Sequence, residues 1–257
     1  MEISTIIGLA LAACSVLGMV LLEHGSPAEL IGIPAAVIVF GGTFAASFVQ
    51  FPLSVMLSLP RLIMMTFHPY KGDLAELIEQ LVSLADHARR DGLLSLEEAA
   101  SQLDDQFLRK GIMLVVDGVD SKTVSTVMET DMALASERHH LGIGLLEAMG
   151  GYAPTMGILG TVMGLVNVLK NLASPEKLGA LIASAFLATL YGIGSANLLW
   201  LPLAGKLTGK DDKEKLAREL MMEGVLSIQG GESPRIVREK LDSFLAPAER
   251  GAEKKEE

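Results

Sequence analysis

The sequence is poor in cysteine, in aromatic residues and in positive charge. One of its 257 residues is a cysteine, Cys14, and 5% are aromatic. A single cysteine cannot form an internal disulfide, and no Cys/His spacing resembles a zinc site. The net charge of −10 argues against nucleic acid as a partner, because a phosphate backbone binds basic surfaces. No phosphate loop or catalytic nucleophile motif is present, so the sequence predicts neither an enzyme nor a cofactor.

Charge is also absent from four long apolar runs. They cover residues 3–22, 30–51, 148–169 and 178–205, and within the last of them only Asn197 is strongly polar. A helix rises about 1.5 Å per residue and the bilayer core is about 30 Å thick, so about 20 apolar residues span it. The sequence therefore predicts an all-α polytopic membrane protein with four transmembrane helices.

The first apolar run contains Leu-Ala-Ala-Cys at residues 11–14, which looks like a lipoprotein cleavage box. A secretory signal starts with positive charge, whereas residues 1–4 contain no lysine or arginine. The run also continues to Leu22, well past the cysteine. We therefore expect a first helix that is retained.

Basic residues indicate the orientation in the membrane. The short loop at 23–29 has none and the loop at 170–177 has two, while the other nineteen lie in 52–147 or after 204. Lysine and arginine accumulate on the cytoplasmic side, although the rule is weaker for loops longer than about 60 residues. We expect both termini and the large loop to be cytoplasmic.

These observations divide the chain into five parts. Residues 1–51 would hold the first two spans, and 148–205 the third and fourth. The apolar but proline-broken segment 52–67 suits a helix lying in the membrane interface. Residues 68–147 would form a cytoplasmic helical domain, and 206–257 C-terminal helices with a disordered tail after Pro247.

Apolar residues spaced three and four apart predict amphipathic helices outside the membrane. Asp73 and Glu76 have the spacing of a capping box, and Gly92 would end that helix. A second helix is expected from Ser95, with an apolar face that reaches Phe107. Further helices are expected from Ser121 towards the third span, at 218–227 and at 234–245.

The interiors of the four runs contain no Asp, Glu, Lys, Arg or His. Proton and sodium relays normally use an ionisable group within the membrane. The chain could therefore supply one wall of an ion pathway, but a partner would have to donate the carboxylate.

The third and fourth runs have residues suited to such a wall. Thr161 and Thr189 place hydroxyls at similar depth, and Pro154 and Pro202 each free a carbonyl and permit a kink. Ordinary helix packing accounts for the small residues equally well, so both interpretations stay open. The packing candidates are Gly157, Gly160 and Gly164 in the third run and Gly192 and Gly194 in the fourth.

A charged turn separates two of the expected cytoplasmic helices. Arg89 and Arg90 end one helix, and Glu97 and Glu98 begin the next. Complementarity to the helix dipoles explains this arrangement. A surface that presents both charges to a charged partner explains it as well.

Several segments make the chain recognisable. Residues 150–165, GGYAPTMGILGTVMGL, resemble the third span of flagellar stator A subunits, the MotA/PomA group of the MotA/TolQ/ExbB family. The likeness continues at 188–192, 196–207, 88–97 and 231–235, and so extends over nearly the whole chain. The third-span motif by itself is shared with the wider ExbB/TolQ group.

This resemblance implies a non-enzymatic rotary ion motor in the bacterial inner membrane. In the family, A subunits form a homo-oligomeric ring, apparently a pentamer, around two helices of a MotB/PomB-type B subunit anchored to peptidoglycan. The B subunit supplies the intramembrane Asp. Ion passage is thought to turn the ring, and the charged turn contacts the rotor protein FliG.

The resemblance also implies residue roles. Arg89 and Glu97 match the torque-generating pair, with Arg90 and Glu98 as neighbours. Pro154 and Pro202 match the family's two prolines linked to ion-coupled conformational change. Thr161 and Thr189 match its two pore-facing threonines.

The identity of the coupling ion depends on the threonines. Sodium-driven members resemble the pattern of Thr161 and Thr189, whereas proton-driven members often have alanine at the third-span position. Ala188 departs from the PomA-like pattern, which often has a second threonine there. We expect Na⁺, with H⁺ as the alternative. An ExbB/TolQ-type energiser of an envelope complex, with three spans, and a passive membrane scaffold are the competing functions.

Overall fold

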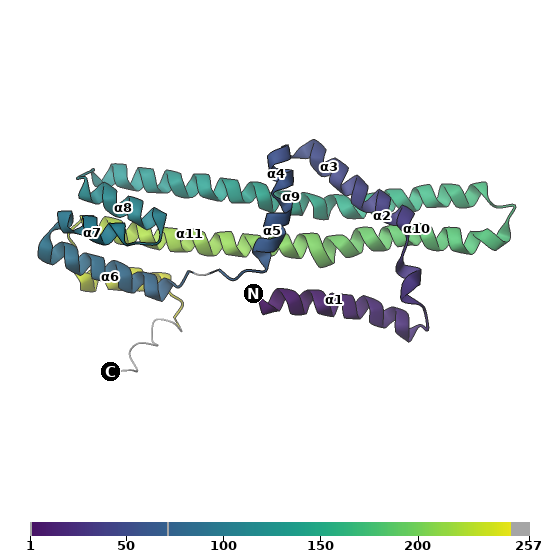
Figure 1. Ribbon diagram of the computed structural model, residues 1–257, viewed down its shortest axis with the longest axis horizontal. Helices are drawn as coiled ribbons and strands as arrows, with labels where there is room; N and C mark the ends of the chain where they lie inside the picture. Colours follow the sequence, from purple (N-terminus) through teal and green to yellow (C-terminus); the bar gives the residue numbers. More distant parts are fainter. Residues whose placement is uncertain (1, 71, 248–257) are drawn as a thin grey trace. The chain divides into compact units, whose positions relative to one another are not determined.

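The computed structural model describes residues 2–70 and 72–247 (Figure 1). All secondary structure in these ranges is helical. The chain forms two compact units. The first comprises Met1–Pro69 with His139–Gly209, and the second Tyr70–Arg138 with Lys210–Glu257.

Four helical stretches of the described chain are long and apolar enough to cross a membrane. They are Ile3–Leu22, Pro27–Gln50, Ser121–Lys170 and Pro175–Gln229. The predicted all-helical class with four candidate spans is therefore confirmed. The first stretch is helix α1 and the third is helix α9.

The second and fourth stretches are composite helices. The second consists of the 3₁₀ turn η1 (Pro27–Leu30), α2 (Ile33–Ala36), the π-helical turn η2 (Val37–Gly41) and α3 (Gly42–Gln50). The fourth consists of α10 (Pro175–Ser195), the π-helical turn η4 (Ala196–Trp200) and α11 (Leu201–Gln229). The two π-helical turns were not predicted.

Helix α11 corrects one expectation. It continues without a break through residues 218–227, where the sequence suggested a separate short helix. The segment after Gly209 is rich in Lys, Glu, Leu and Met, all good helix formers, and the next strong breaker is Gly230-Gly231.

The apolar segment 52–67 forms two short helices where one was expected. They are α4 (Leu53–Leu57) and α5 (Leu59–Thr66). Pro60 explains the break, because it has no N–H to donate to the carbonyl four residues earlier, whereas the first turn of a new helix accepts a proline.

The core of the first unit forms where α9 packs against η4 and α11. Its fully buried side chains include Leu145, Leu146 and Met149 of α9, with Trp200 and Leu203 opposite. Phe44 of α3 meets the Trp200 ring edge to face, with ring centroids 6.4 Å apart. No residue of α1 is buried, so this helix contributes little to the core.

The second unit buries its own core among short helices. Fully buried members include Leu81, Leu108, Ile112, Leu220 and Leu241. Besides parts of α9 and α11, its elements are α6 (Leu74–Asp91), η3 (Leu93–Ser95), α7 (Leu96–Ser101), α8 (Gln106–Val116), α12 (Pro234–Leu241) and η5 (Asp242–Phe244).

Helix ends in this unit follow the sequence in part. Gly92 ends α6 with φ +87°, a left-handed conformation that favours glycine. Asp73 accepts a hydrogen bond from the Ala75 amide at 2.9 Å, but Glu76 does not complete the predicted capping box. The Ser95 hydroxyl donates to the carbonyl of Gly92 at 2.6 Å and does not cap α7.

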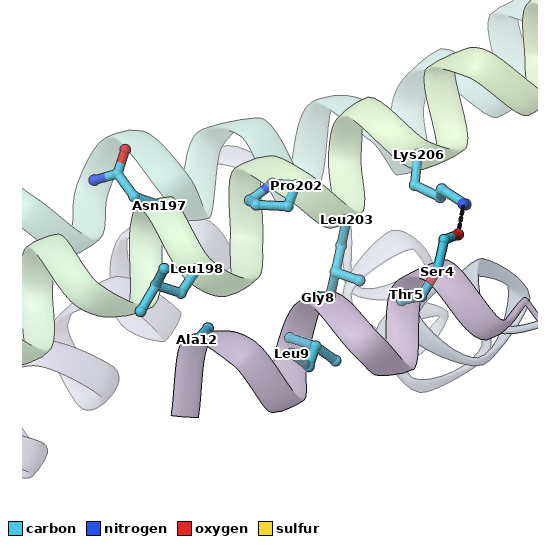
Figure 2. Close-up of a pocket in the computed structure, with 10 residues that line it drawn as sticks. All are labelled: Ser4, Thr5, Gly8, Leu9, Ala12, Asn197, Leu198, Pro202, Leu203 and Lys206. Atoms are coloured by element: carbon cyan, nitrogen blue, oxygen red, sulfur yellow. Dashed lines mark hydrogen bonds between the residues drawn. The ribbon is translucent and has the colours of Figure 1, made fainter. Parts of the chain in front are cut away.

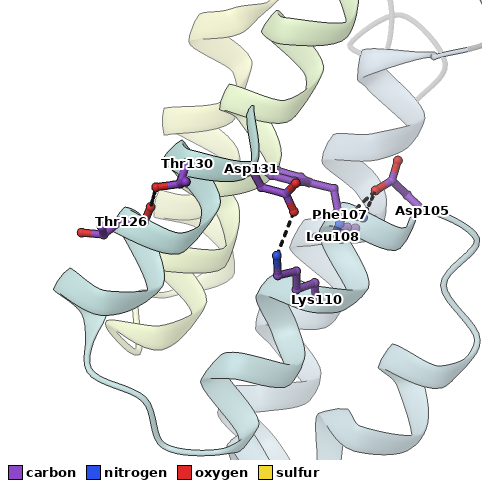
Figure 3. A network of polar contacts seen from close by, with 7 residues as sticks. All are labelled: Asp105, Phe107, Leu108, Lys110, Thr126, Thr130 and Asp131. Carbon is purple, nitrogen blue, oxygen red and sulfur yellow. Dashed lines mark hydrogen bonds and ion pairs between the residues drawn. The ribbon is translucent and has the colours of Figure 1, made fainter. Parts of the chain in front are cut away.

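The helix expected from Ser95 through Phe107 is two helices. Helix α7 ends at Ser101, and Asp105 caps the next helix, α8 (Figure 3). Its carboxylate accepts hydrogen bonds from the amides of Phe107 and Leu108 at 2.8 and 2.9 Å. At the C-terminus, α12 is shorter than the expected 234–245 and is followed by η5. The expected disordered tail after Pro247 lies outside the described residues.

Candidate functional site

Thr161 of α9 and Thr189 of α10 lie together, both half-buried. Their hydroxyl oxygens are within hydrogen-bond distance of each other. Thr161 Oγ1 also lies 3.1 Å from each of the backbone carbonyl oxygens of Gly157 and Ala185. Two hydroxyl and two carbonyl oxygens therefore gather between the third and fourth spans. Such neutral oxygens are ligands for hard cations, although the cluster contains no carboxylate.

Glycines allow the two helices to approach backbone to backbone. A Cβ built on Gly157 would lie 2.8 Å from the carbonyl oxygen of Ala188, and one on Gly192 would lie 2.6 Å from that of Ala153. Neither carbonyl belongs to a flexible side chain, so only glycine fits at these positions. By contrast, a Cβ on Gly194 would meet nothing within 4 Å.

The other two predicted packing glycines also face neighbouring helices. A Cβ on Gly160 would lie 2.7 Å from the Ala188 methyl group and 2.8 Å from Cγ2 of Ile38 in η2. A Cβ on Gly164 would lie 2.5 Å from the Ala185 methyl group. The packing and ion-pathway interpretations are therefore compatible, because the close packing is what brings the two threonine hydroxyls together.

The two prolines occupy different settings. Pro154 lies inside the continuous helix α9, and its Cα would be 3.2 Å from a Cβ on Gly192. Pro202 is the second residue of α11, which follows η4 directly. Because proline has no N–H, it leaves a carbonyl of the preceding turn without its α-helical donor, and a π-helical turn accommodates such a defect.

Tyr191 is a structural residue whose role the sequence did not reveal. Its hydroxyl donates a hydrogen bond to the carbonyl of Leu30 and accepts one from the amide of Gly32 at 2.9 Å. It thereby fastens the fourth span to the start of the second. The contacts join residues about 160 positions apart, so no local pattern could have predicted them.

The charged turn exposes all four predicted side chains. Arg90 forms an ion pair with Asp86, one helical turn earlier. Across the described ranges, Arg89, Glu97 and Glu98 have no ion-pair partner. The structure thus separates two adjacent arginines that the sequence analysis treated together, although the i,i+4 spacing of Asp86 and Arg90 could have indicated the pair.

Helix α12 is fastened to α6, which carries the arginines. Arg238 donates two hydrogen bonds to the carboxylate of Glu79, and these bonds lower the pKa of Glu79. Lys240 binds Glu232 at 2.7 Å and Glu223 at 3.3 Å. The bond to Glu232 is the main cause that raises the pKa of Lys240. A further ion pair, between Lys110 of α8 and Asp131 of α9, is 2.9 Å long (Figure 3).

Within the described ranges, no group of three or more His, Cys, Asp and Glu residues could hold a metal ion. The oxygen cluster at Thr161 and the exposed charged turn are therefore the two candidate sites, one in each compact unit.

Comparisons with known proteins agree over the whole chain. Residues 99–244 match the model of the "MotA/TolQ/ExbB proton channel family". The uncharacterized protein YtxD of Bacillus subtilis is 40% identical over 82% of this chain and 78% of its own. Motility protein A of Treponema pallidum is 38% identical over 96% and 95% of the two chains. Chemotaxis protein PomA of Vibrio alginolyticus is 35% identical over 98% and 99%.

A solved structure shows the same fold. A chain of the flagellar MotAB stator complex from Bacillus subtilis is 34% identical and superposes with a TM-score of 0.91. The match covers 99% of this chain and 100% of that one.

Proposed function

Because the chain belongs to the MotA/PomA group of flagellar stator A subunits within the MotA/TolQ/ExbB proton channel family, we propose that it converts ion flow into torque on the flagellar rotor. It is a multi-pass inner-membrane protein of channel type and not an enzyme. In this proposal it works as a ring, a homopentamer, around a MotB/PomB-type B subunit that donates the intramembrane Asp.

The oxygen cluster at Thr161 and Thr189 carries this proposal. It lies between the apolar runs 148–169 and 178–205, which contain no Asp, Glu, Lys, Arg or His, so it provides polar ligands without charge. A partner carboxylate would complete an ion pathway there, and the solved relative is a complex of A and B subunits. Pro154 and Pro202, on either side of the cluster in the sequence, would permit the conformational change that accompanies ion passage.

Sodium is the coupling ion in this proposal. A partly dehydrated Na⁺ requires oxygen ligands to replace its water, and the two threonine hydroxyls with the Ala185 carbonyl offer three. The relative PomA and the Motility protein A chains are similarly close in sequence, so the similarity scores do not select the ion. Protons are the alternative.

The second compact unit is the cytoplasmic part that contacts the rotor protein FliG. The basic residues near the ends of the four spans support an orientation with both termini and the large loop in the cytoplasm. The exposed, unpaired charges of Arg89, Glu97 and Glu98 would meet complementary charges on FliG.

One experiment tests the motor and the ion together. The chain is expressed with its cognate B subunit in flagellated cells that lack stators, and swimming speed is recorded against external sodium at constant ionic strength. A speed that rises and saturates with sodium is expected. Swimming that ignores sodium but needs the proton gradient would overturn the choice of ion. No swimming, with a membrane complex present and a control stator working, would favour an ExbB/TolQ-type energiser.

The charged turn has its own test. Arg89→Glu is expected to slow swimming more than Arg90→Glu, because Arg90 is engaged with Asp86 whereas Arg89 is available to the rotor. Swimming speed and the amount of membrane complex are measured for both variants. Equal effects of the two reversals, or normal swimming of the Arg89 variant, would contradict the role assigned to Arg89.

A further inference from the structure

Helix α10 is held between two neighbours around Thr189. On one side, the Thr189 hydroxyl lies within hydrogen-bond distance of Thr161 of α9. Tyr191 follows two residues later, and two residues turn an α-helix by about 200°, so the tyrosine lies on the opposite side of α10. There it meets the second span, where its ring centroid is 6.2 Å from that of Phe40. The position of Thr189 therefore depends on contacts on both sides of the helix.

The Tyr191 hydroxyl binds a segment of backbone that is not helical. Between η1 and α2 the chain is extended, with φ −96° at Ile31 and −128° at Gly32. The hydroxyl donates to the carbonyl of Leu30 and accepts from the amide of Gly32. Backbone groups outside a helix find few other partners within a membrane. Removing the hydroxyl would therefore release the carbonyl and the amide together.

The same segment packs directly on α10. A Cβ built on Gly32 would lie 2.9 Å from Cδ1 of Leu187, which is one helical turn before Tyr191. Further along the second span, Val39 is fully buried in one cluster with Ala188, the residue next to Thr189. The tyrosine hydroxyl thus fastens the second span at the place where its packing bears on the oxygen cluster.

Helix α1 contacts a different part of the fourth span. Ser4 accepts a hydrogen bond from Lys206 at 3.2 Å, and a pocket lies between α1 and the segment from Asn197 to Lys206 (Figure 2). No residue of α1 is buried. We therefore attribute the support of α10 around Thr189 to the second span.

We infer that Tyr191 is a positioning residue of the oxygen cluster. By fastening the second span to the side of α10 that faces away from α9, its hydroxyl keeps Thr189 in contact with Thr161. Tyr191 is not itself an ion ligand, because its hydroxyl is engaged with two backbone groups. The inference rests on the proposed function in one respect, namely that the cluster binds the coupling ion.

The dependence of swimming on sodium tests the inference in the motor. Tyr191→Phe removes only the hydroxyl, and it is expected to raise the sodium concentration for half-maximal speed about fivefold, a typical effect of a residue that contacts no ligand. Maximal speed at saturating sodium and the amount of membrane complex should stay near the parent values. A purely structural role would instead lower these two quantities and leave the half-saturating concentration unchanged.

Tyr152→Phe is the matched control. The Tyr152 hydroxyl also binds the second span, since it donates to Oε1 of Gln50 at 2.6 Å. Gln50 is at the opposite end of that span from Leu30 and Gly32, away from Thr189. The control should keep the sodium dependence of the parent. An unchanged dependence in Tyr191→Phe, or the same shift in both variants, would overturn the inference.

Disulfide formation tests the geometry without the motor. Thr161→Cys and Thr189→Cys are combined with Cys14→Ser, which removes the one cysteine of the chain, in the complex with the B subunit. Added copper phenanthroline oxidises the two thiols, and a disulfide should form readily because the oxygens that they replace lie within hydrogen-bond distance. Adding Tyr191→Phe should slow its formation, whereas adding Tyr152→Phe should not.

The two tests separate this inference from the proposed function. Equal rates of disulfide formation with and without the Tyr191 hydroxyl would overturn the positioning role, as would a parent pair that forms no disulfide. A slower rate in Tyr191→Phe, in a complex that does not drive swimming, would support the positioning role and contradict the proposed function.

Discussion

The hydroxyl of Thr161 lies within hydrogen-bond distance of more acceptors than its single proton can bind. It has one proton, but two carbonyl oxygens and the oxygen of Thr189 lie within hydrogen-bond distance. Whichever acceptor receives the proton, lone pairs of the two hydroxyls remain side by side. The same residue therefore both contributes to helix packing and offers oxygen to a cation.

Removing this hydroxyl should weaken ion coupling without disrupting packing. Thr161→Val keeps the side-chain shape, and it is expected to raise the sodium concentration for half-maximal swimming about tenfold, because a bond to a charged group is lost. Thr161→Ser, which keeps the hydroxyl, should stay near the parent value. The control is Thr155→Val, an exposed threonine of the same helix whose hydroxyl donates to the carbonyl of Tyr152. An unchanged sodium dependence in Thr161→Val would remove the threonine from the pathway.

Glycine 192 gives a residue-scale test of close packing. Gly192→Ala forces a methyl group against the carbonyl of Ala153 and should destabilise the chain by about 1–3 kcal/mol, the usual cost of overpacking. Gly194→Ala, two residues along the same helix, places its methyl in open space and should change stability by less than about 0.5 kcal/mol. Thermal unfolding of the two purified variants measures the difference. Equal midpoints would show that α9 and α10 are not in close contact at Gly192.

At the scale of elements, the membrane-spanning helices were easier to predict than the helix boundaries outside the membrane. A span must be long, apolar and helical, because backbone groups in lipid have no other hydrogen-bond partners. The end of α6 at Gly92 was also predicted from the sequence, since a backbone position with a positive φ favours glycine. The break between α7 and α8 was not predicted, because the apolar spacing continues to Phe107 while Asp105 supplies a competing cap.

The candidate sites were predictable in composition but not in arrangement. Spacing placed Thr161 and Thr189 at similar depth, yet their contact depends on the approach of Gly157 and Gly192, which only the tertiary structure shows. The π-helical turn before Pro202 was not predicted either, because the sequence shows the missing N–H of the proline but not the helix geometry that accommodates it.

The cap of α8 provides an element-scale prediction. Asp105→Ala removes the acceptor of two backbone amides and should lower stability by about 1 kcal/mol. Asp104→Ala changes the same charge at an exposed neighbouring position and should have little effect. The thermal unfolding midpoints of the full chain are compared. If the two variants lose the same stability, the effect is one of charge and the cap contributes nothing.

At the scale of the whole molecule, the pair of Arg238 and Glu79 links folding stability to pH. The folded pKa of Glu79 lies below its ordinary value of 4.5, so its contribution to stability is present above that value and is lost as pH falls through the lowered pKa. Both side chains are partly exposed, which limits the contribution to below about 1 kcal/mol.

Glu79→Gln should therefore lower stability at pH 7 and have no effect once the carboxylate is protonated at lower pH. Thermal midpoints of the complex across pH 7 to about pH 3 measure this change. Glu76→Gln, an exposed glutamate of the same helix, serves as the control and should leave the pH dependence unchanged. A Glu79→Gln deficit that persists in acid would show that the carboxylate charge is not responsible.

The absence of buried residues in α1 has an evolutionary consequence. Its 20 residues span about 30 Å, the thickness of the hydrocarbon core. None of its side chains is buried in the chain, so the helix has few contacts with neighbouring side chains to preserve. Membranes differ in thickness by a few ångströms, and a mismatched helix must tilt or deform the bilayer at a cost. Substitutions and small changes of length in α1 can adapt the chain to a new membrane while the oxygen cluster and the charged turn stay as they are.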